Sequence, residues 1–358
     1  MSDKLGIAII GTGNIAKGYV TDLLTYPEIE ITGVNDIDTA RAQAFAAEHG
    51  VTAYPNGDAL LNDPRVQIVV NLTPHFAHRD VTEMALKAGK HVYSEKPIAL
   101  TSADAWGLVD LARERGLRLA CSPFTPIGDA QQTAWALIRQ GKLGKVRVVY
   151  GEANWGRIES WHPAPIPFYE VGAFFDVGVY LLALVTTLFG AARKVWSYGA
   201  LVLPDRVTKD GQPYTLTTPD WQLAILEMAD GTQVRITSDF YVSNNSTRQT
   251  GIEFHGDAGS LYMESFFLFD SPLLYAPFGE ALQPIELMRA PYRGIPWGRG
   301  VLELANAIRE GRPHRFTGEQ AAHITDILTA ADQSQETGQA VTLTSDFPPP
   351  MPEDWARG

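Results

Sequence analysis

A glycine-rich loop between an apolar run and a helical pattern constrains the fold of this chain more than any other feature. The apolar run covers Leu5–Ile10, the loop reads Gly11-Thr12-Gly13-Asn14-Ile15-Ala16, and the helical pattern covers residues 15–24. The two glycines allow a tight turn and a close approach of backbone to a pyrophosphate, whose charge the following helix start stabilises. The loop therefore predicts a dinucleotide-binding unit with cofactor contacts from Gly11, Gly13, Asn14 and Ile15.

The alternation of apolar runs and helical patterns continues to residue 121. Apolar runs at 30–35, 68–72, 91–94 and 118–121 are separated by helical patterns at 39–49, 78–88 and 101–115. Strands that alternate with helices form a parallel sheet covered on both faces, and runs that are apolar at successive positions suit strands buried on both sides. We therefore predict an α/β fold with a doubly wound Rossmann domain over residues 1–123.

The pattern changes after Pro123. One helical pattern at 129–140 precedes longer runs in which apolar and polar residues alternate, at 147–155, 193–203, 221–228, 232–241, 251–255 and 260–264. Asp230-Gly231 is a hairpin-turn signal between two of these runs. We predict an α+β domain over residues 124–358, with an open, largely antiparallel sheet and two late helices at 301–310 and 318–337.

Composition and charge exclude several classes of function. The 358 residues are enough for two cores, and the net charge of -12 argues against nucleic acid or an anionic membrane as a partner. The one cysteine, Cys121, allows neither an intramolecular disulfide nor a Cys-based zinc cluster, and no metal site is predicted. The uncharged run at 177–192 is shorter than the roughly 20 residues of a membrane span, so we expect a core helix and a cytoplasmic protein.

Asp36 bears on the choice of cofactor. It ends the second apolar run, about 20 residues past the glycine loop, where an acidic residue binds the adenosine ribose in dinucleotide-binding folds. Its carboxylate would repel a 2′-phosphate, and Ile37 rather than an arginine follows it. The pattern favours NAD over NADP, unless Asp36 is a solvated loop residue.

The tripeptide Glu95-Lys96-Pro97 follows the fourth apolar run. Together with the glycine loop, it resembles the signature of the glucose–fructose oxidoreductase / inositol dehydrogenase family (Gfo/Idh/MocA). The resemblance implies that Lys96 reaches the reacting hydroxyl and the nicotinamide ribose, that Glu95 contacts the ribose or positions the lysine, and that Pro97 shapes the turn. A fixed ammonium would stabilise the alkoxide that develops as hydride leaves carbon.

Residues 71–78 resemble a turn of the same family that passes the nicotinamide-ribose side of the cofactor. The segment reads Asn71-Leu72-Thr73-Pro74-His75, with a second histidine at position 78. The resemblance implies that Thr73 and Pro74 shape the turn beside the cofactor. For His78, a cofactor contact and a helix-capping role both remain open.

Residues 172–180 resemble the family's Asp-x-Gly-x-x motif, with Asp176 at its start and Tyr180 where histidine is common. The spacing of four places both on one helix face. The resemblance implies that Asp176 orients substrate hydroxyls or the catalytic group and that Tyr180 is the acid/base, with Lys96 stabilising the phenolate. Glucose–fructose oxidoreductases and dimeric dihydrodiol dehydrogenases also have tyrosine at this place. A helix-start aspartate and a core aromatic are the alternatives.

A loop bounded by prolines leads into that motif and contains several aromatic residues between 155 and 169. Aromatic faces stack on the C–H faces of sugars, so the loop is a candidate substrate wall, with His162 and Tyr169 as substrate-binding residues. The alternative is that these side chains only anchor a long loop.

The leading hypothesis is an NAD(P)-dependent oxidoreductase that acts on a secondary alcohol or ketone of a sugar, polyol or sugar derivative. The alternatives are a dihydrodiol or xylose dehydrogenase-like enzyme, a glycosidase-type relative that holds NAD tightly, and a non-catalytic NAD-binding sensor. The resemblance also implies a homodimer or homotetramer built through the second-domain sheet.

Overall fold

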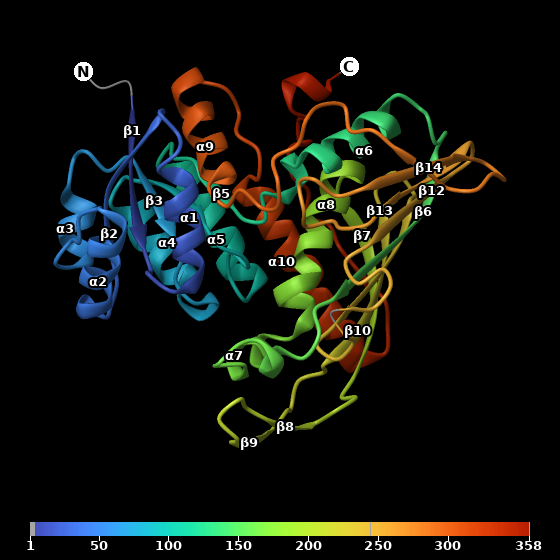
Figure 1. Cartoon of the computed structure of the whole chain (residues 1–358), viewed down its shortest axis with the longest axis horizontal. Coiled ribbons are helices and arrows are strands. Elements are labelled where there is room, and N and C mark those ends of the chain that lie inside the picture. Colours follow the sequence, from blue (N-terminus) through green and yellow to red (C-terminus); the bar gives the residue numbers. More distant parts are fainter. Residues whose placement is uncertain (1–3, 244, 358) are drawn as a thin grey trace. The chain divides into compact units, whose positions relative to one another are not determined.

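The computed structural model describes residues 4–243 and 245–357. The chain divides into two compact units, Met1–Phe124 with Pro296–Thr325 and Thr125–Ile295 with Asp326–Gly358. The chain therefore enters the second unit after Phe124, returns to the first at Pro296 and leaves it again within its last long helix (Figure 1). In the part of the chain described by the structure, no helix is both long enough and apolar enough to cross a membrane.

The first unit contains a five-stranded parallel sheet with the strand order β2-β1-β3-β4-β5. Every residue of β1, β3 and β5 is buried, as expected for runs that are apolar at successive positions. The strands are β1 (Leu5–Ile10), β2 (Ile29–Asn35), β3 (Ile68–Asn71), β4 (His91–Ser94) and β5 (Leu119–Cys121). The next two strands in the sequence, β2 and β3, lie on opposite sides of β1, so the strand order reverses at β1. The glycine loop, which follows β1, therefore lies at this switch point.

Helices cover both faces of this sheet, so the doubly wound prediction is confirmed. Ile7 and Ile9 pack against one group of helices, whereas Ala8 and Ile10 pack against the other. The first group is α1 (Asn14–Leu23), α2 (Thr39–His49) and α9 (Arg299–Glu310), and the second is α3 (Gly57–Asn62), α4 (His78–Lys87) and α5 (Ser102–Glu114).

The second unit contains a nine-stranded sheet with the order β15-β14-β13-β12-β6-β11-β10-β7-β16. Each neighbouring pair is antiparallel except β6 and β11, so the predicted open, largely antiparallel sheet is confirmed. The strands are β6 (Val146–Asn154), β7 (Ala192–Ala200), β10 (Trp221–Met228), β11 (Gln233–Asp239), β12 (Ile252–Gly256), β13 (Gly259–Met263), β14 (Leu273–Pro277), β15 (Gln283–Ile285) and β16 (Val341–Thr342).

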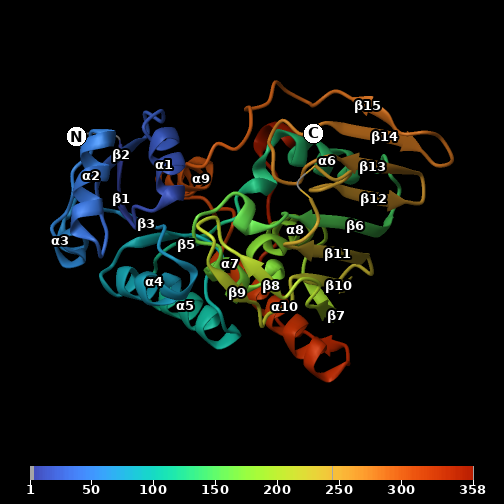
Figure 2. The ribbon, with the colours of Figure 1, turned by 60° about the horizontal axis from the view of Figure 1, so that its bottom comes forward.

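Helices of the second unit pack against one face of this sheet (Figures 1 and 2). Gly151 of β6 lies directly under the Leu181 side chain, which allows α8 to approach the strand closely. The uncharged run at 177–192 contains the whole of this buried helix, as predicted. These helices are α6 (Asp129–Arg139), α8 (Val179–Phe189) and the end of α10 (Gly318–Thr337), whereas the short helix α7 (Ile166–Val171) lies outside this layer. A small hairpin of β8 (Asp205–Val207) and β9 (Pro213–Thr215) extends from the unit.

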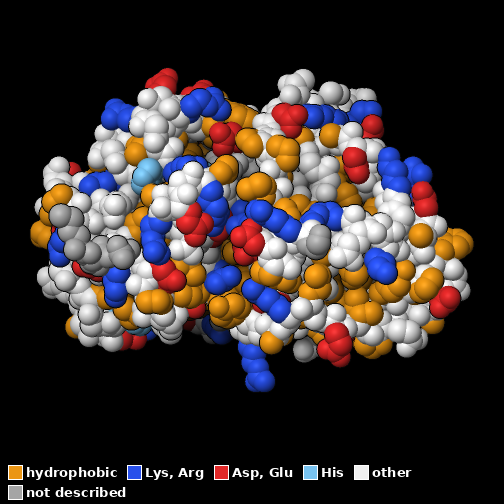
Figure 3. All heavy atoms as spheres, turned by 90° about the horizontal axis from the view of Figure 1, so that it is seen from above, with side chains coloured by type: hydrophobic (Ala, Val, Ile, Leu, Met, Phe, Trp, Pro, Cys, Tyr) orange, Lys and Arg blue, Asp and Glu red, His pale blue; other side chains and the backbone are white. Residues whose placement is uncertain are grey.

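The surface shows no large region of one charge in the view of Figure 3, where Lys and Arg side chains lie among Asp and Glu side chains. The described residues contain no group of three or more His, Cys, Asp or Glu side chains suited to hold a metal ion. Cys121 is buried and free, at the end of β5.

Candidate active site

A cleft of about 940 Å³ lies in the first unit, where β1, β2 and β3 end. Ligands of open parallel sheets bind outside the carboxyl ends of the strands, next to the point where the strand order reverses. The cleft has this position, and its walls are mainly apolar with some polar groups. Among the residues that line it are the predicted cofactor contacts Gly11, Gly13, Asn14, Ile15, Asp36, Thr73 and Pro74.

The glycine loop leaves room for a ligand at the start of α1. Gly11 has a φ of +101°, and a Cβ atom there would lie 2.6 Å from the Leu72 carbonyl oxygen, so only glycine fits. A Cβ atom on Gly13 would meet nothing within 4 Å. No side chain caps the N–H groups of the first turn of α1. Exposed N–H groups beside open space fit the pyrophosphate of a dinucleotide.

Asp36 is buried at the cleft wall, with 7% of its surface exposed. Its Oδ2 atom accepts hydrogen bonds from Thr12 N at 2.8 Å and Thr12 Oγ1 at 2.9 Å, and Oδ1 accepts one from Asp38 N at 2.9 Å. Burial by itself raises the pKa of Asp36, but hydrogen bonds from Arg41, Thr12 and Asp38 together lower this pKa to about 2. The carboxylate is therefore ionised at neutral pH and is tied to the glycine loop.

Arg41 is a cleft residue that the sequence argument overlooked. Its Nη2 atom lies 2.5 Å from Asp36 Oδ1, and its Nε atom donates to Oδ2 at 3.2 Å. The side chain is 49% exposed and lines the cleft. Its position could have predicted this contact, because an arginine in the first turn of the helix after Asp36 can reach back to the strand end. A guanidinium at this place can accommodate a 2′-phosphate.

Glu95 and Lys96 lie at the end of β4, outside the set of residues that line the cleft. The Glu95 carboxylate points into the protein: Oε1 accepts a hydrogen bond from the Tyr19 hydroxyl at 2.5 Å and Oε2 accepts one from Lys96 N at 3.2 Å. Only 4% of Glu95 is exposed, whereas Lys96 is half-buried. The Lys96–Pro97 peptide bond is cis. Glu95 is thus bonded to the backbone of the lysine.

His78 connects the turn that contains Lys96 and Pro97 to the cleft wall. Its Nδ1 atom lies 2.7 Å from the Pro97 carbonyl oxygen, and Nε2 lies 2.7 Å from the Thr73 carbonyl oxygen. Two carbonyl partners favour the imidazolium, but burial is the larger effect and lowers the pKa of His78 to about 4. The neutral ring therefore lies between the turns after β3 and β4, where it donates a hydrogen bond to one of the two carbonyl oxygens, and it does not line the cleft.

In the second unit, Asp176 lies in a π-helical turn, Phe174–Gly178, and Tyr180 lies in the first turn of α8. Such wide turns are rare and occur frequently at functional sites. The Tyr180 ring meets Phe267 edge-on with 4.8 Å between centroids, and Phe267 meets Trp155 in the same way at 5.3 Å. Tyr180 is 6% exposed, whereas Asp176, Phe267 and Trp155 are half-buried. The rings of Tyr180, Phe267 and Trp155 form an aromatic group next to the end of β6.

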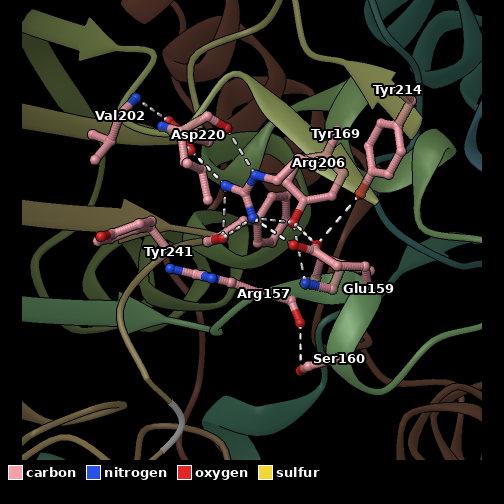
Figure 4. A network of polar contacts seen from close by, with 12 residues as sticks. Arg157, Glu159, Ser160, Tyr169, Val202, Arg206, Tyr214, Asp220 and Tyr241 are labelled. Atoms are coloured by element: carbon pink, nitrogen blue, oxygen red, sulfur yellow. Dashed lines mark hydrogen bonds and ion pairs between the residues drawn. The ribbon is translucent and has the colours of Figure 1, made fainter. Parts of the chain in front are cut away.

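Tyr169 belongs to a buried polar network (Figure 4). Its hydroxyl donates to Glu159 Oε2 at 2.5 Å and accepts hydrogen bonds from Arg206 Nη1 at 2.9 Å and Ile158 N at 3.2 Å. Burial and the Glu159 carboxylate raise the pKa of Tyr169. The ring is 3% exposed, so its contacts are with the protein.

Arg206 is the centre of this network and was not singled out from the sequence. Its side chain is fully buried, 2.5 Å from Asp220 Oδ2 and 2.9 Å from Glu159 Oε1. The Asp220 carboxylate also accepts hydrogen bonds from Val202 N and Leu203 N. The network joins the loop at 156–170 to the β8–β9 hairpin (Figure 4). His162 contacts its own loop, with Nδ1 2.9 Å from the Ala164 carbonyl oxygen.

Both halves of the chain match models of one protein family. Residues 5–122 match the model described as "Oxidoreductase family, NAD-binding Rossmann fold", and residues 131–262 match the "GFO/IDH/MocA C-terminal domain".

Two curated relatives and one solved structure are similar to the chain. A trans-1,2-dihydrobenzene-1,2-diol dehydrogenase of Sus scrofa is 28% identical over 233 residues, which span 64% of this chain and 66% of that enzyme, just under two thirds. A dTDP-3,4-didehydro-2,6-dideoxy-alpha-D-glucose 3-reductase of Streptomyces antibioticus is 31% identical over 252 residues, 69% of this chain and 75% of that enzyme. An NAD binding oxidoreductase from Klebsiella pneumoniae shares the fold, with a TM-score of 0.84, 21% identity and coverage of 96% and 100% of the two chains.

Proposed function

Because the chain belongs to the GFO/IDH/MocA family of NAD-binding oxidoreductases, we propose that it transfers a hydride between a nicotinamide nucleotide and a secondary alcohol or ketone of a sugar, polyol or sugar derivative. The observation that supports this most strongly is the bridge formed by His78. Its imidazole contacts both Thr73, which lines the cleft, and Pro97, which follows Lys96. The proposed catalytic lysine is thus held at a fixed place relative to the proposed cofactor cleft.

The chain's residues have distinct tasks in this proposal. Gly11, Gly13, Asn14 and Ile15 bind the pyrophosphate side of the nucleotide, Asp36 faces the adenosine ribose, and Thr73 and Pro74 form the opposite wall. When bound, the nicotinamide ring supplies the hydride acceptor or donor. Lys96 stabilises negative charge on the reacting oxygen. Asp176 orients substrate hydroxyls, and Tyr180 takes or returns the hydroxyl proton.

The positions of Glu95, His78 and Tyr169 assign them supporting tasks. Glu95 and His78 lie beneath and beside Lys96, with their polar atoms bonded to protein groups. Tyr169 holds the loop that precedes the Asp176 turn. His162, which is half-buried in that loop, remains a candidate for substrate contact.

For the substrate, the proposal favours a ring-shaped polyol. The half-buried rings of Trp155 and Phe267 offer faces on which the C–H side of a sugar can stack. The Streptomyces relative is by its name a reductase of a deoxy-sugar nucleotide, and the Sus scrofa relative a dehydrogenase of a cyclic diol. A dihydrodiol dehydrogenase-like activity is the second candidate, since Tyr180 lies where histidine is common in the family and dimeric dihydrodiol dehydrogenases have tyrosine.

The proposal includes NAD as the preferred nucleotide, with NADP also accommodated. The ionised Asp36 carboxylate at the cleft wall favours the free ribose hydroxyls of NAD. Arg41 works in the opposite direction, because its guanidinium can turn from Asp36 towards a 2′-phosphate. We also propose a cytoplasmic location, where these nucleotides are available and the single Cys121 stays reduced.

We further propose that the second unit forms a homo-oligomer through the open face of its nine-stranded sheet. Trp196 and Tyr198 of β7, Ile225 of β10 and Tyr150 of β6 are between 36% and 55% exposed, and Ile225 lies directly opposite Trp196 in the sheet. Aromatic residues that gather on one solvent-facing surface favour a protein interface. A homodimer is the simplest assembly that covers such a face.

The test is reduced-nicotinamide absorbance with purified protein, NAD or NADP, and a panel of aldoses, polyols, sugar acids and cyclic diols. A signal that Lys96→Ala abolishes, and that the surface variant Lys17→Ala retains, supports the dehydrogenase and identifies its substrate class. Nucleotide binding without any signal across the panel would contradict the proposal and favour a sensor or chemistry on tightly held NAD.

A further inference from the structure

Tyr19 and Glu95 form a buried pair beneath Lys96 in the first unit. We propose that the Tyr19 hydroxyl and the Glu95 carboxylate are positioning groups for Lys96, which hold its backbone in place and keep a negative charge next to its ammonium. This inference rests on the proposed function and adds to it a residue, Tyr19, that no sequence motif indicates.

Tyr19 reaches the lysine turn from the helix that begins at the glycine loop. It lies on the buried face of α1, and none of its surface is exposed. Its ring packs beside Tyr93 of β4 at 6.3 Å and beside Trp297 at 6.0 Å between centroids. Its hydroxyl donates to Glu95 Oε1 at 2.5 Å. The pair therefore joins the helix that would face the pyrophosphate to the strand end that contains the proposed catalytic lysine.

Glu95 is held in place by both its backbone and its side chain. Its N–H group donates to the Asn71 carbonyl oxygen at 2.9 Å, which ties the end of β4 to β3. Its second carboxylate oxygen, Oε2, accepts the hydrogen bond of Lys96 N at 3.2 Å. If the carboxylate moved, the backbone of the lysine would lose a partner, so Glu95 acts directly on the residue that it positions.

The groups around Glu95 determine its charge. Tyr19 approaches from α1, Tyr93 from β4, Cys121 and Ser122 from the end of β5, and Lys96 from its own turn. Burial raises the pKa of Glu95, whereas the positive charge of Lys96 and the hydrogen bonds from Tyr19, Lys96 N and Ser122 act against this rise.

The phenol of Tyr19 stays protonated, because burial and the Glu95 carboxylate raise its pKa well above the usual value. It is therefore a permanent donor to Glu95. Without this donor, the buried carboxylate would lose one of its hydrogen bonds, and its protonation would become easier. The negative charge that acts on the Lys96 ammonium would then be lost at a higher pH than in the natural protein.

The reactivity of Lys96 tests the proposal without any substrate. The protein is acetylated over a range of pH, and mass spectrometry measures the acetylated fraction of the peptide that contains Lys96. This fraction reports when the amine loses its proton. The exposed Lys87 is the internal reference. We compare the natural protein with Glu95→Gln and Tyr19→Phe. The matched control is Tyr26→Phe, which removes another hydroxyl that donates to a carboxylate, Asp22 Oδ2 at 2.7 Å, in the same unit.

We expect Lys96 to be acetylated from a lower pH in Glu95→Gln, and with a smaller change in Tyr19→Phe, because a neighbouring opposite charge favours the ammonium. Tyr26→Phe should leave this pH unchanged. With the substrate identified in the panel, Tyr19→Phe should lower kcat about tenfold at an unchanged nucleotide Kd, the loss expected for one hydrogen bond to a charged group.

The inference is overturned if Glu95→Gln and Tyr19→Phe are folded, as judged by circular dichroism and nucleotide binding, and their Lys96 midpoints equal that of Tyr26→Phe. If the variants do not fold, Glu95→Asp replaces them, since it keeps the charge. An unchanged midpoint together with a tenfold loss of kcat in that variant would support the positioning role. Failure of the natural protein to transfer hydride would contradict the proposed function alone, because the acetylation result does not depend on it.

Discussion

Replacing Arg206 should destabilise the second unit far more than replacing an arginine of its surface. Arg206 is fully buried between Asp220, whose side chain is also 0% exposed, and Glu159, which is 13% exposed. The substitution Arg206→Met keeps most of the apolar stem but removes the charge. Two carboxylates would then face one another, and the Tyr169 hydroxyl would lose one of its donors (Figure 4).

The expected loss follows from the burial of the pair. Breaking a buried ion pair by removing one partner costs about 3–5 kcal/mol, because the remaining charge is left uncompensated. Backbone N–H groups of Val202 and Leu203 still bond Asp220, so we expect the lower part of this range, about 3 kcal/mol. The matched control is Arg147→Met, which breaks an exposed pair with Asp257, at 57% and 53% exposure, and should cost at most about 1 kcal/mol.

Hydrogen exchange read by mass spectrometry is the suitable assay, because the two units need not unfold together. Peptides that cover residues 156–171 and the β8–β9 hairpin should exchange faster in Arg206→Met than in Arg147→Met, whereas peptides of the first unit should not change. The KM for the substrate should rise, since the loop leads into the Asp176 turn. Equal protection of the loop in both variants would refute the argument.

Three further predictions concern the first unit. Arg41→Ala should raise the KM for NADP more than that for NAD, measured by reduced-nicotinamide absorbance, since it removes the cation beside Asp36; equal changes would contradict this. Gly11→Ala should abolish nucleotide binding, measured by fluorescence titration, because its Cβ would lie 2.6 Å from the Leu72 carbonyl oxygen at a φ of +101°; binding as in the natural protein would contradict this. Burial lowers the pKa of His78 from 6.5 to about 4 in the folded chain. Between pH 6.5 and about 4, the unfolded chain therefore binds more protons than the folded chain. Stability should therefore fall as pH drops through that interval, by about 3 kcal/mol in total, and urea unfolding of His78→Gln should lack this part of the pH dependence.

The sequence predicted the long elements well because their own side chains determine them. The runs Leu5–Ile10, His91–Ser94 and Trp221–Met228 form strands with the predicted bounds, and residues 39–49 and 318–337 form helices with the predicted bounds. In each of these segments, the spacing of the apolar residues fits one type of element, a strand or a helix, better than the other. The glycine loop and the acidic strand end likewise lie together in one cleft, because the carboxyl ends of neighbouring parallel strands meet at one edge.

Several short elements were not predicted, since few residues determine them. The helices Gly57–Asn62 and Ile166–Val171 have six residues each, and the strands β8, β9 and β15 have three. Such segments are stabilised by partners that are distant in the sequence, and a local pattern does not name those partners. The π-helical turn at Phe174–Gly178 also has no local signature, although the spacing of Asp176 and Tyr180 was visible.

Partners of buried charges were the largest omission at the site. Tyr169 is conspicuous as an aromatic residue in a candidate substrate loop, but Arg206, which bonds it, lies 37 residues further along the chain. Arg41 and Tyr19 were overlooked for the same reason, because their contacts with Asp36 and Glu95 exist only after the helices pack on the sheet. Sequence motifs indicate which groups meet the ligand, whereas the groups that hold them become visible only in the structure.

The fate of a deuterium label tests hydride transfer most directly. A substrate from the panel, deuterated at the carbon of its reacting secondary hydroxyl, is incubated with NAD and the protein, and the nucleotide is then analysed by mass spectrometry. We predict that the reduced nucleotide contains the deuterium, and that Lys96→Ala suppresses its formation while Lys17→Ala does not. Turnover of the substrate with no deuterium in the nucleotide, or equal labelling in Lys96→Ala, would contradict hydride transfer assisted by Lys96.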